Sequence, residues 1–171
     1  TFEMLDLPAI CEIAHKHGAR VAIDNTWGTP LYFKSFSHGV DFSVHAATKY
    51  IVGHSDAMLG IVVATRESWP DLRETARAIG ANAGPDEVYL GLRGIRTMAV
   101  RLPRHMESGT KVADWLRSRP EVTAVLHPAL PQDPGHTIWK RDFLGACGLF
   151  SLELQKKYSD EAVAAFVDHL E

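Results

Sequence analysis

The sequence contains few cysteines, no long apolar run and no strong excess of charge of either sign. Its two cysteines, Cys11 and Cys147, argue against a disulfide framework and favour a reduced, cytoplasmic chain. No apolar run approaches the ~20 residues that a membrane-spanning helix needs. The net charge of -3 gives no indication of a nucleic acid or an anionic membrane surface as a partner. None of the nine histidines combines with a cysteine at a spacing typical of zinc, so no metal is expected.

What is present is the composition of an ordinary globular chain. Hydrophobic residues make up 46% and charged residues 23% of the 171 positions, which is enough to bury a substantial core. The chain begins at Thr1 rather than a methionine, and the helical pattern over 161–171 stops without a capping residue. We therefore expect it to be a fragment of a longer subunit.

Apolar periodicity predicts short strands that alternate with helices. Helices are expected over 6–17, 66–81 and 86–119, the last with a break or a bend between 96 and 103. Strands are expected over 20–23, 41–45 and 57–64, and the last is apolar enough to be buried on both faces. This alternation predicts an α/β fold, with a mostly parallel sheet flanked by helices.

The pattern changes after Pro120, where a second unit is expected to begin. Strands are predicted over 122–126 and 149–154, with helices over 136–142 and from Ser159 onward. We predict that residues 1–96 belong to a large cofactor-binding domain. Residues 97–171 are then a bridging helix and part of a smaller α+β C-terminal domain.

Two residues that can carry chemistry follow the first two predicted strands. Asp24 comes directly after one strand, and Lys49 follows the next, behind two alanines and Thr48. Ligands of parallel α/β sheets lie beyond the carboxyl ends of the strands, where both residues are expected. A Schiff-base lysine and an aspartate that holds a pyridinium nitrogen are what a pyridoxal phosphate site needs. We predict Lys49 as the catalytic residue, and Asp24, Thr48 and Lys49 as the cofactor-binding residues, with the Thr48 hydroxyl donating to the phosphate.

Each residue also has a simpler interpretation when it is taken alone. Lys49 can be a surface lysine after a strand, and Asp24 can be a turn residue that binds its own backbone. In that case the chain is a non-catalytic α/β binding domain. The two residues together, at neighbouring strand ends, favour the cofactor site.

Three further features have open roles. Residues 53–56 turn the chain into the next strand or contact a ligand directly. Trp27 lines a substrate pocket or belongs to the core. Four arginines lie at helical spacing: Arg93, Arg96, Arg101 and Arg104. They form a solvated face or an interface, and one of them can contact an anion.

Several segments together resemble one known family, the Cys/Met-metabolism family of pyridoxal phosphate-dependent enzymes. The resemblance is in register along nearly the whole chain and rests on residues 21–27, 43–60, 92–97, 127–130 and 136–150. It implies the type I aminotransferase-like fold. Trp27 and Ala46 resemble members that cleave L-cystathionine by β-elimination to homocysteine, pyruvate and ammonia, as in methionine biosynthesis. Alternative reactions within the family are those of the γ-lyases, the γ-synthases and methionine γ-lyase.

The resemblance also implies parts that these residues do not supply. Family subunits carry a Gly-rich phosphate loop upstream and an arginine for the substrate carboxylate downstream. They assemble as homodimers or homotetramers with shared active sites, and they act on small amino-acid substrates. We expect the same of the protein that contains this chain.

Overall fold

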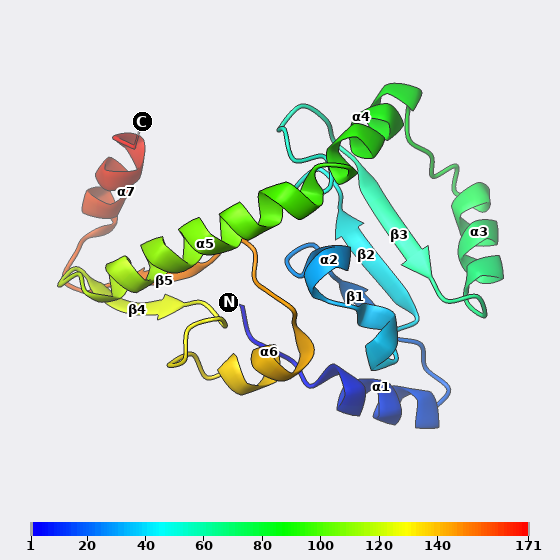
Figure 1. The fold of residues 1–171 in the computed structure, drawn as a ribbon, viewed down its shortest axis with the longest axis horizontal. Coiled ribbons are helices and arrows are strands. Elements are labelled where there is room, and N and C mark those ends of the chain that lie inside the picture. The colour runs from blue at the N-terminus through cyan, green and yellow to red at the C-terminus, as the bar shows by residue number, and fades with distance from the viewer. Residues whose placement is uncertain (1, 171) are drawn as a thin grey trace.

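The computed structural model describes residues 2–170 as two small sheets joined by one long helix (Figure 1). In chain order the elements are α1 (Leu7–Lys16), β1 (Ala22–Asp24), α2 (Thr29–Tyr32), the 3₁₀ helix η1 (Ser35–His38), β2 (Phe42–Ala46), β3 (Gly60–Ala64), α3 (Trp69–Ala78), α4 (Pro85–Ile95), α5 (Met98–Arg117), β4 (Val122–Leu126), α6 (His136–Asp142), β5 (Ser151–Leu154) and α7 (Asp160–Asp168). The predicted elements are all found, with ends shifted by a few residues.

Helix α1 begins and ends at local signals. The Asp6 carboxylate accepts a hydrogen bond from the Ala9 N–H at 3.4 Å, and a proline occupies the first turn. Leu7 and Cys11 lie one turn apart, and both are buried. This single apolar stripe docks α1 on the rest of the fold.

The first sheet has the order β1-β2-β3. Strands β1 and β2 are parallel, with Ala22 opposite Phe42 and Asp24 opposite Val44. Because parallel strands end at the same edge, Asp24 and the turn after Ala46 lie side by side. The sequence-based prediction of neighbouring strand ends is therefore confirmed.

Strand β3 differs from the prediction in direction and burial. It pairs with β2 in antiparallel orientation, so this three-stranded sheet has one parallel and one antiparallel pair. Val62 and Val63 remain 41% and 42% exposed, so the predicted burial on both faces is wrong for residues 2–170. An apolar run shows which surroundings a strand tolerates, but burial also requires other elements that pack on both faces of the strand.

The break predicted in the long helical pattern falls at Arg96 and Thr97, between α4 and α5. Pro103 lies inside α5 and does not end it. Figure 1 shows α5 running from the first sheet to the second sheet, whose two strands β4 and β5 are antiparallel. Helix α5 thus connects the two sheets along the chain.

The core holds the Lys49 turn against α5. Ala47 and Ile51 of that turn pack with Met98 and Leu102 of α5, together with Tyr32 and Cys147. Ala47 and Leu102 are fully buried. The backbone around Lys49 is therefore anchored by apolar packing on both sides of the lysine.

We expect Leu102→Ala to lower the free energy of unfolding by about 2–5 kcal/mol, because it leaves a cavity under the Lys49 turn. Val100→Ala is the matched control, since Val100 lies on the same helix and is 78% exposed. Denaturant unfolding of the intact protein measures both. Equal effects of the two variants would contradict the assigned core.

Neither cysteine forms a disulfide, and both are buried. Between residues 2 and 170, no helix is long and apolar enough to cross a membrane. Across the same residues, no group of His, Cys, Asp and Glu side chains is arranged to hold a metal ion.

Candidate functional site

A groove of about 1430 Å³ opens at the carboxyl ends of β1 and β2. The strand-end turns, the loop before β3 and the start of α5 form its walls. Its lining includes Asp24, Thr26, Trp27, Thr48, Lys49, Ser55, Asp56, Arg101 and His105. The two residues predicted to carry chemistry therefore face the same space, at the sheet edge where ligands of such folds bind.

The β1 side of the groove is fixed by its own turn. Asp24 Oδ1 accepts the Thr26 N–H at 2.9 Å, while the carboxylate remains exposed to the groove. The buried Asn25 amide donates to the Thr29 and Phe33 carbonyls at 3.3 and 3.1 Å. Asp24 therefore both shapes the turn and presents a charge to the groove.

Thr26 joins the two strand ends, a role that the sequence did not reveal. Its Oγ1 accepts the Ala46 N–H at 2.7 Å, across the gap between β1 and β2. This bond fixes the Asp24 turn relative to the turn that carries Lys49. A threonine two residues after a strand is too common to signal such a contact by itself.

Lys49 lies on a tight turn whose backbone is fully bonded. Its N–H donates to Ala46 O at 3.0 Å, and its carbonyl accepts from Gly53 N at 2.8 Å. The side chain is exposed and lines the groove. Within residues 2–170 the Lys49 amine takes part in no ion pair. The backbone of Lys49 is therefore fixed, while its amine is accessible from the groove.

The Thr48 hydroxyl bonds the backbone of its own chain. Its hydroxyl accepts the Leu59 N–H at 2.8 Å and donates to the Leu59 carbonyl at 3.3 Å. The hydroxyl thus ties the Lys49 turn to the residue before β3. Donation to a phosphate oxygen would require the hydroxyl hydrogen to turn away from Leu59.

His45 is buried beneath the site on β2. Its Nε2 lies 3.0 Å from Ser43 Oγ. Burial lowers the pKa of His45, although the Asp24 carboxylate and a backbone hydrogen bond with Asn25 act in the opposite direction. The ring therefore adds no full positive charge behind Asp24 at neutral pH.

Trp27 has both of the roles that the sequence left open. It lines the groove, and its Nε1 donates to the Leu149 carbonyl at 2.9 Å. Its ring meets Phe143 edge to face, with centroids 5.7 Å apart. Trp27 thus connects the end of β1 to the chain just before β5 and closes one side of the groove.

The predicted arginine face is only partly correct. Arg93 pairs with Asp56 at 2.6 Å, and Arg104 pairs with Glu107 at 3.4 Å, both near the surface. Arg101 instead turns inward, lines the groove and bonds backbone carbonyls. Helical spacing alone could not distinguish this arginine from its neighbours.

His127 is a fully buried histidine near the groove, next to Trp27. Its Nδ1 accepts the Ala129 N–H at 3.2 Å, and its ring stacks on Phe150. Nε2 is buried and has no hydrogen-bond partner among the described residues. Burial lowers the pKa of His127, against a weaker opposing effect of Asp133.

We expect this burial to make the protein less stable as the pH falls from 7 toward 5. Unfolded histidine has a pKa of about 6.5. Because the folded pKa of His127 is lower, the unfolded chain binds more protons between the two values. The contribution of the neutral, buried His127 to the free energy of unfolding is therefore fully present above the unfolded pKa. It is lost as the pH falls through the folded pKa. His127→Asn, which keeps an acceptor for Ala129 but cannot titrate, should flatten the plot of melting temperature against pH. An unchanged slope would contradict the expectation.

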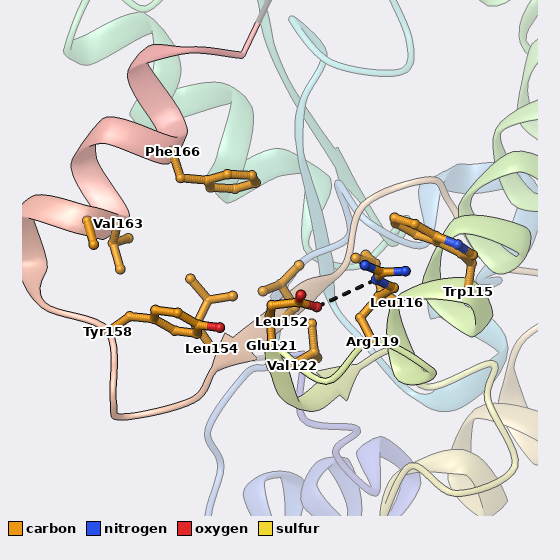
Figure 2. Close-up of a pocket in the computed structure, with 11 residues that line it drawn as sticks. Trp115, Leu116, Arg119, Glu121, Val122, Leu152, Leu154, Tyr158, Val163 and Phe166 are labelled. Atoms are coloured by element: carbon orange, nitrogen blue, oxygen red, sulfur yellow. Dashed lines mark ion pairs between the residues drawn. The ribbon is translucent and has the colours of Figure 1, made fainter.

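A second cavity of about 520 Å³ lies far from these residues, between α5, the β4–β5 sheet and α7 (Figure 2). Its lining is mostly apolar, including Trp115, Val163 and Phe166. Its charged groups, Arg119 and Glu121, pair with each other at 3.5 Å. It presents no unpaired carboxylate or lysine amine, so the groove at Asp24 and Lys49 is the candidate active site.

Comparison with known proteins gives one consistent family. The model for "Cys/Met metabolism PLP-dependent enzyme" matches residues 1–171. Cystathionine beta-lyase MetC of Escherichia coli is 47% identical over 99% of this chain, and cystathionine beta-lyase of Haemophilus influenzae is 46% identical over 100%. A crystal structure of cystathionine gamma synthase from Xanthomonas oryzae pv. oryzae superposes with a TM-score of 0.92 at 38% identity over 99% of the chain.

These relatives are considerably longer than the chain. It covers 43% of the Escherichia coli protein, 44% of the Haemophilus influenzae protein and 43% of the Xanthomonas chain. The high TM-score bears out the predicted type I aminotransferase-like fold for this portion.

Proposed function

Because this chain belongs to the Cys/Met metabolism family of pyridoxal phosphate-dependent enzymes, we propose that it is part of a carbon–sulfur lyase acting on L-cystathionine. The reaction is β-elimination, in which cystathionine and water give homocysteine, pyruvate and ammonia. The observation that carries the proposal is the placement of the Asp24 carboxylate and the unpaired Lys49 amine in one groove. The 46–47% identity to two cystathionine beta-lyases supports the choice of substrate.

The residues of the groove fit pyridoxal phosphate. Lys49 would hold its aldehyde carbon, and Asp24 would hold its pyridine nitrogen, from the ends of adjacent parallel strands. When bound, this group supplies an electron sink for the electron pair left on the substrate α-carbon. Thr48 would reach the phosphate only by giving up its donation to the Leu59 carbonyl.

Each residue of the chain then has a defined task. The Lys49 amine would take the proton from the substrate α-carbon, which requires a base at close range. The Asp24 carboxylate, through its negative charge, would keep a proton on the ring nitrogen of the bound cofactor. Thr26 fixes the spacing between these two groups through Ala46 N. Trp27, held by the Leu149 carbonyl, forms one wall of the groove.

The choice of β- over γ-elimination rests on Trp27, Ala46 and the beta-lyase relatives. The same groove residues would serve a γ-reaction, and the Xanthomonas relative at 38% identity is a gamma synthase. Incubation of the intact protein with cystathionine followed by product analysis tests the choice. Pyruvate and homocysteine are expected. Cysteine and 2-oxobutyrate would instead assign a cystathionine γ-lyase, and a γ-synthase or a methionine γ-lyase would be identified by its own substrates.

The alternative, a non-catalytic binding domain, can be tested by a simpler experiment on cofactor binding. The intact protein should bind pyridoxal phosphate and absorb visible light when purified with it. A colourless protein that binds no cofactor would reject the lyase and favour the binding domain.

We further propose that the complete site is shared between subunits of a homodimer or homotetramer. The groove is larger than the ~300–1,000 Å³ of typical small-molecule pockets, which leaves room for a wall from elsewhere. Sedimentation of the active protein as a monomer would overturn this proposal. We also propose the division into a cofactor domain over 1–96 and a bridging helix with C-terminal elements over 97–171, supported by the α4–α5 break.

A further inference from the structure

The turn that carries Lys49 is held by one side chain of α5, Arg101. Its Nη2 donates to the Tyr50 carbonyl and to the Gly94 carbonyl, each at 2.9 Å. Tyr50 directly follows Lys49, whereas Gly94 belongs to α4. Arg101 Nε donates to Thr97 Oγ1 at 2.9 Å, which fixes the plane of the guanidinium. One nitrogen therefore bridges the lysine turn and the end of α4.

Arg101 has no carboxylate partner among residues 2–170. It donates to a threonine hydroxyl and two backbone carbonyls, all neutral oxygens, and its Nη1 is buried without a hydrogen-bond partner among the described residues. Burial lowers the pKa of this guanidinium. Desolvating a cation without an ion pair is unfavourable, which argues against a simple stabilising contact.

Two glycines make this contact possible. A Cβ on Gly53 would overlap the Arg101 guanidinium, and a Cβ on Gly94 would overlap the Ile51 and Val52 carbonyls. The lysine turn can therefore approach α4 and Arg101 only because both positions lack a side chain. The close contacts with α4 and Arg101 are therefore made by residues 50–53, directly after Lys49.

We propose that Arg101 is a positioning residue for Lys49, holding the lysine turn at a fixed distance from α4 through the Tyr50 carbonyl. The inference rests on the proposed function of Lys49. A planar fork is needed because its nitrogens reach Thr97 and the two carbonyls together. A lysine at position 101 keeps the charge but cannot hold that geometry.

The first experiment compares Arg101→Lys and Arg101→Met with Arg104→Met in the intact protein. Arg104 is a matched control, because it lies on the same helix, is exposed and pairs with Glu107 of that helix. Both Arg101 variants should lower kcat by about 10–100-fold with KM within about threefold, since small misplacements of a reacting group have effects of this order. The rate of pyridoxyl labelling at Lys49, trapped with borohydride in apoprotein mixed with pyridoxal phosphate, should fall in parallel.

A second pair of variants displaces Arg101 without removing it. Gly53→Ala should reproduce the loss of labelling rate, because the new methyl group pushes the guanidinium away. Gly53 has φ +74°, so the variant also carries backbone strain. Gly18→Ala is the matched control, since Gly18 has φ +71° and nothing lies within 4 Å of the added Cβ.

The outcomes separate this inference from the proposed function. Absence of label at Lys49 in the wild-type protein would reject the function of Lys49 and the inference with it. Wild-type labelling that persists within twofold in Arg101→Lys, Arg101→Met and Gly53→Ala would overturn the role of Arg101 alone. The role of Arg101 would also be overturned if Leu102→Ala, which destabilises the same core, slowed labelling of Lys49 as much as the Arg101 variants do.

Discussion

Lys49→Ala should lower the turnover of cystathionine by the intact protein by at least about 10²–10⁴-fold, the usual contribution of a general acid–base group. The larger end is expected, because Lys49 is proposed both to hold the cofactor and to move the α-proton. Lys49→Arg should not restore activity, since a guanidinium stays protonated and cannot form the covalent link. Steady-state kinetics with purified, cofactor-loaded protein measures the loss.

The chain offers a matched control for this substitution. Lys34 is exposed, and its amine donates to the Pro30 carbonyl at 2.7 Å, outside the groove. Lys34→Ala should keep wild-type turnover. Borohydride reduction followed by peptide mapping should place the pyridoxyl label on Lys49. Finding it on Lys34 or Lys111 would reject the assignment.

Asp24→Asn should lower turnover by about 10²-fold while the fold is retained. Asparagine keeps an oxygen that can accept the Thr26 N–H, so the turn should survive, but it removes the negative charge that holds the ring proton. The charge of Asp24 is proposed to stabilise the transition state more than the bound substrate. We therefore expect kcat to fall by a larger factor than KM rises. A KM effect alone, with kcat unchanged, would contradict the role of Asp24.

Asp56→Asn is the matched control within the same groove. Asp56 lines the groove, but its carboxylate pairs with Arg93 at 2.6 Å, so its negative charge is already balanced. Its loss should change turnover by only a few-fold. The double variant Asp24→Asn, Lys49→Ala should be no worse than Lys49→Ala alone, because both residues are proposed to serve one step.

Local signals in the sequence determined the elements and the approximate site. The Asp6 cap, the apolar strand ahead of Asp24 and the break after α4 act over a few residues, where backbone preferences and periodicity are decisive. Because β1 and β2 are short neighbouring strands, the positions of Asp24 and Lys49 along the chain were enough to place them at one sheet edge. Their chemical roles remain predictions.

Tertiary packing decided the side-chain partners that are distant in the sequence. The inward turn of Arg101, the capture of the Thr48 hydroxyl by Leu59 and the bond from Trp27 to Leu149 join residues that are 11 to 122 positions apart. Such contacts depend on how whole elements dock, and periodicity within one element carries no information about them. The exposure of Val62 and Val63 has the same origin, because residue type gives a strand's preference for burial and the neighbouring layers decide whether burial occurs.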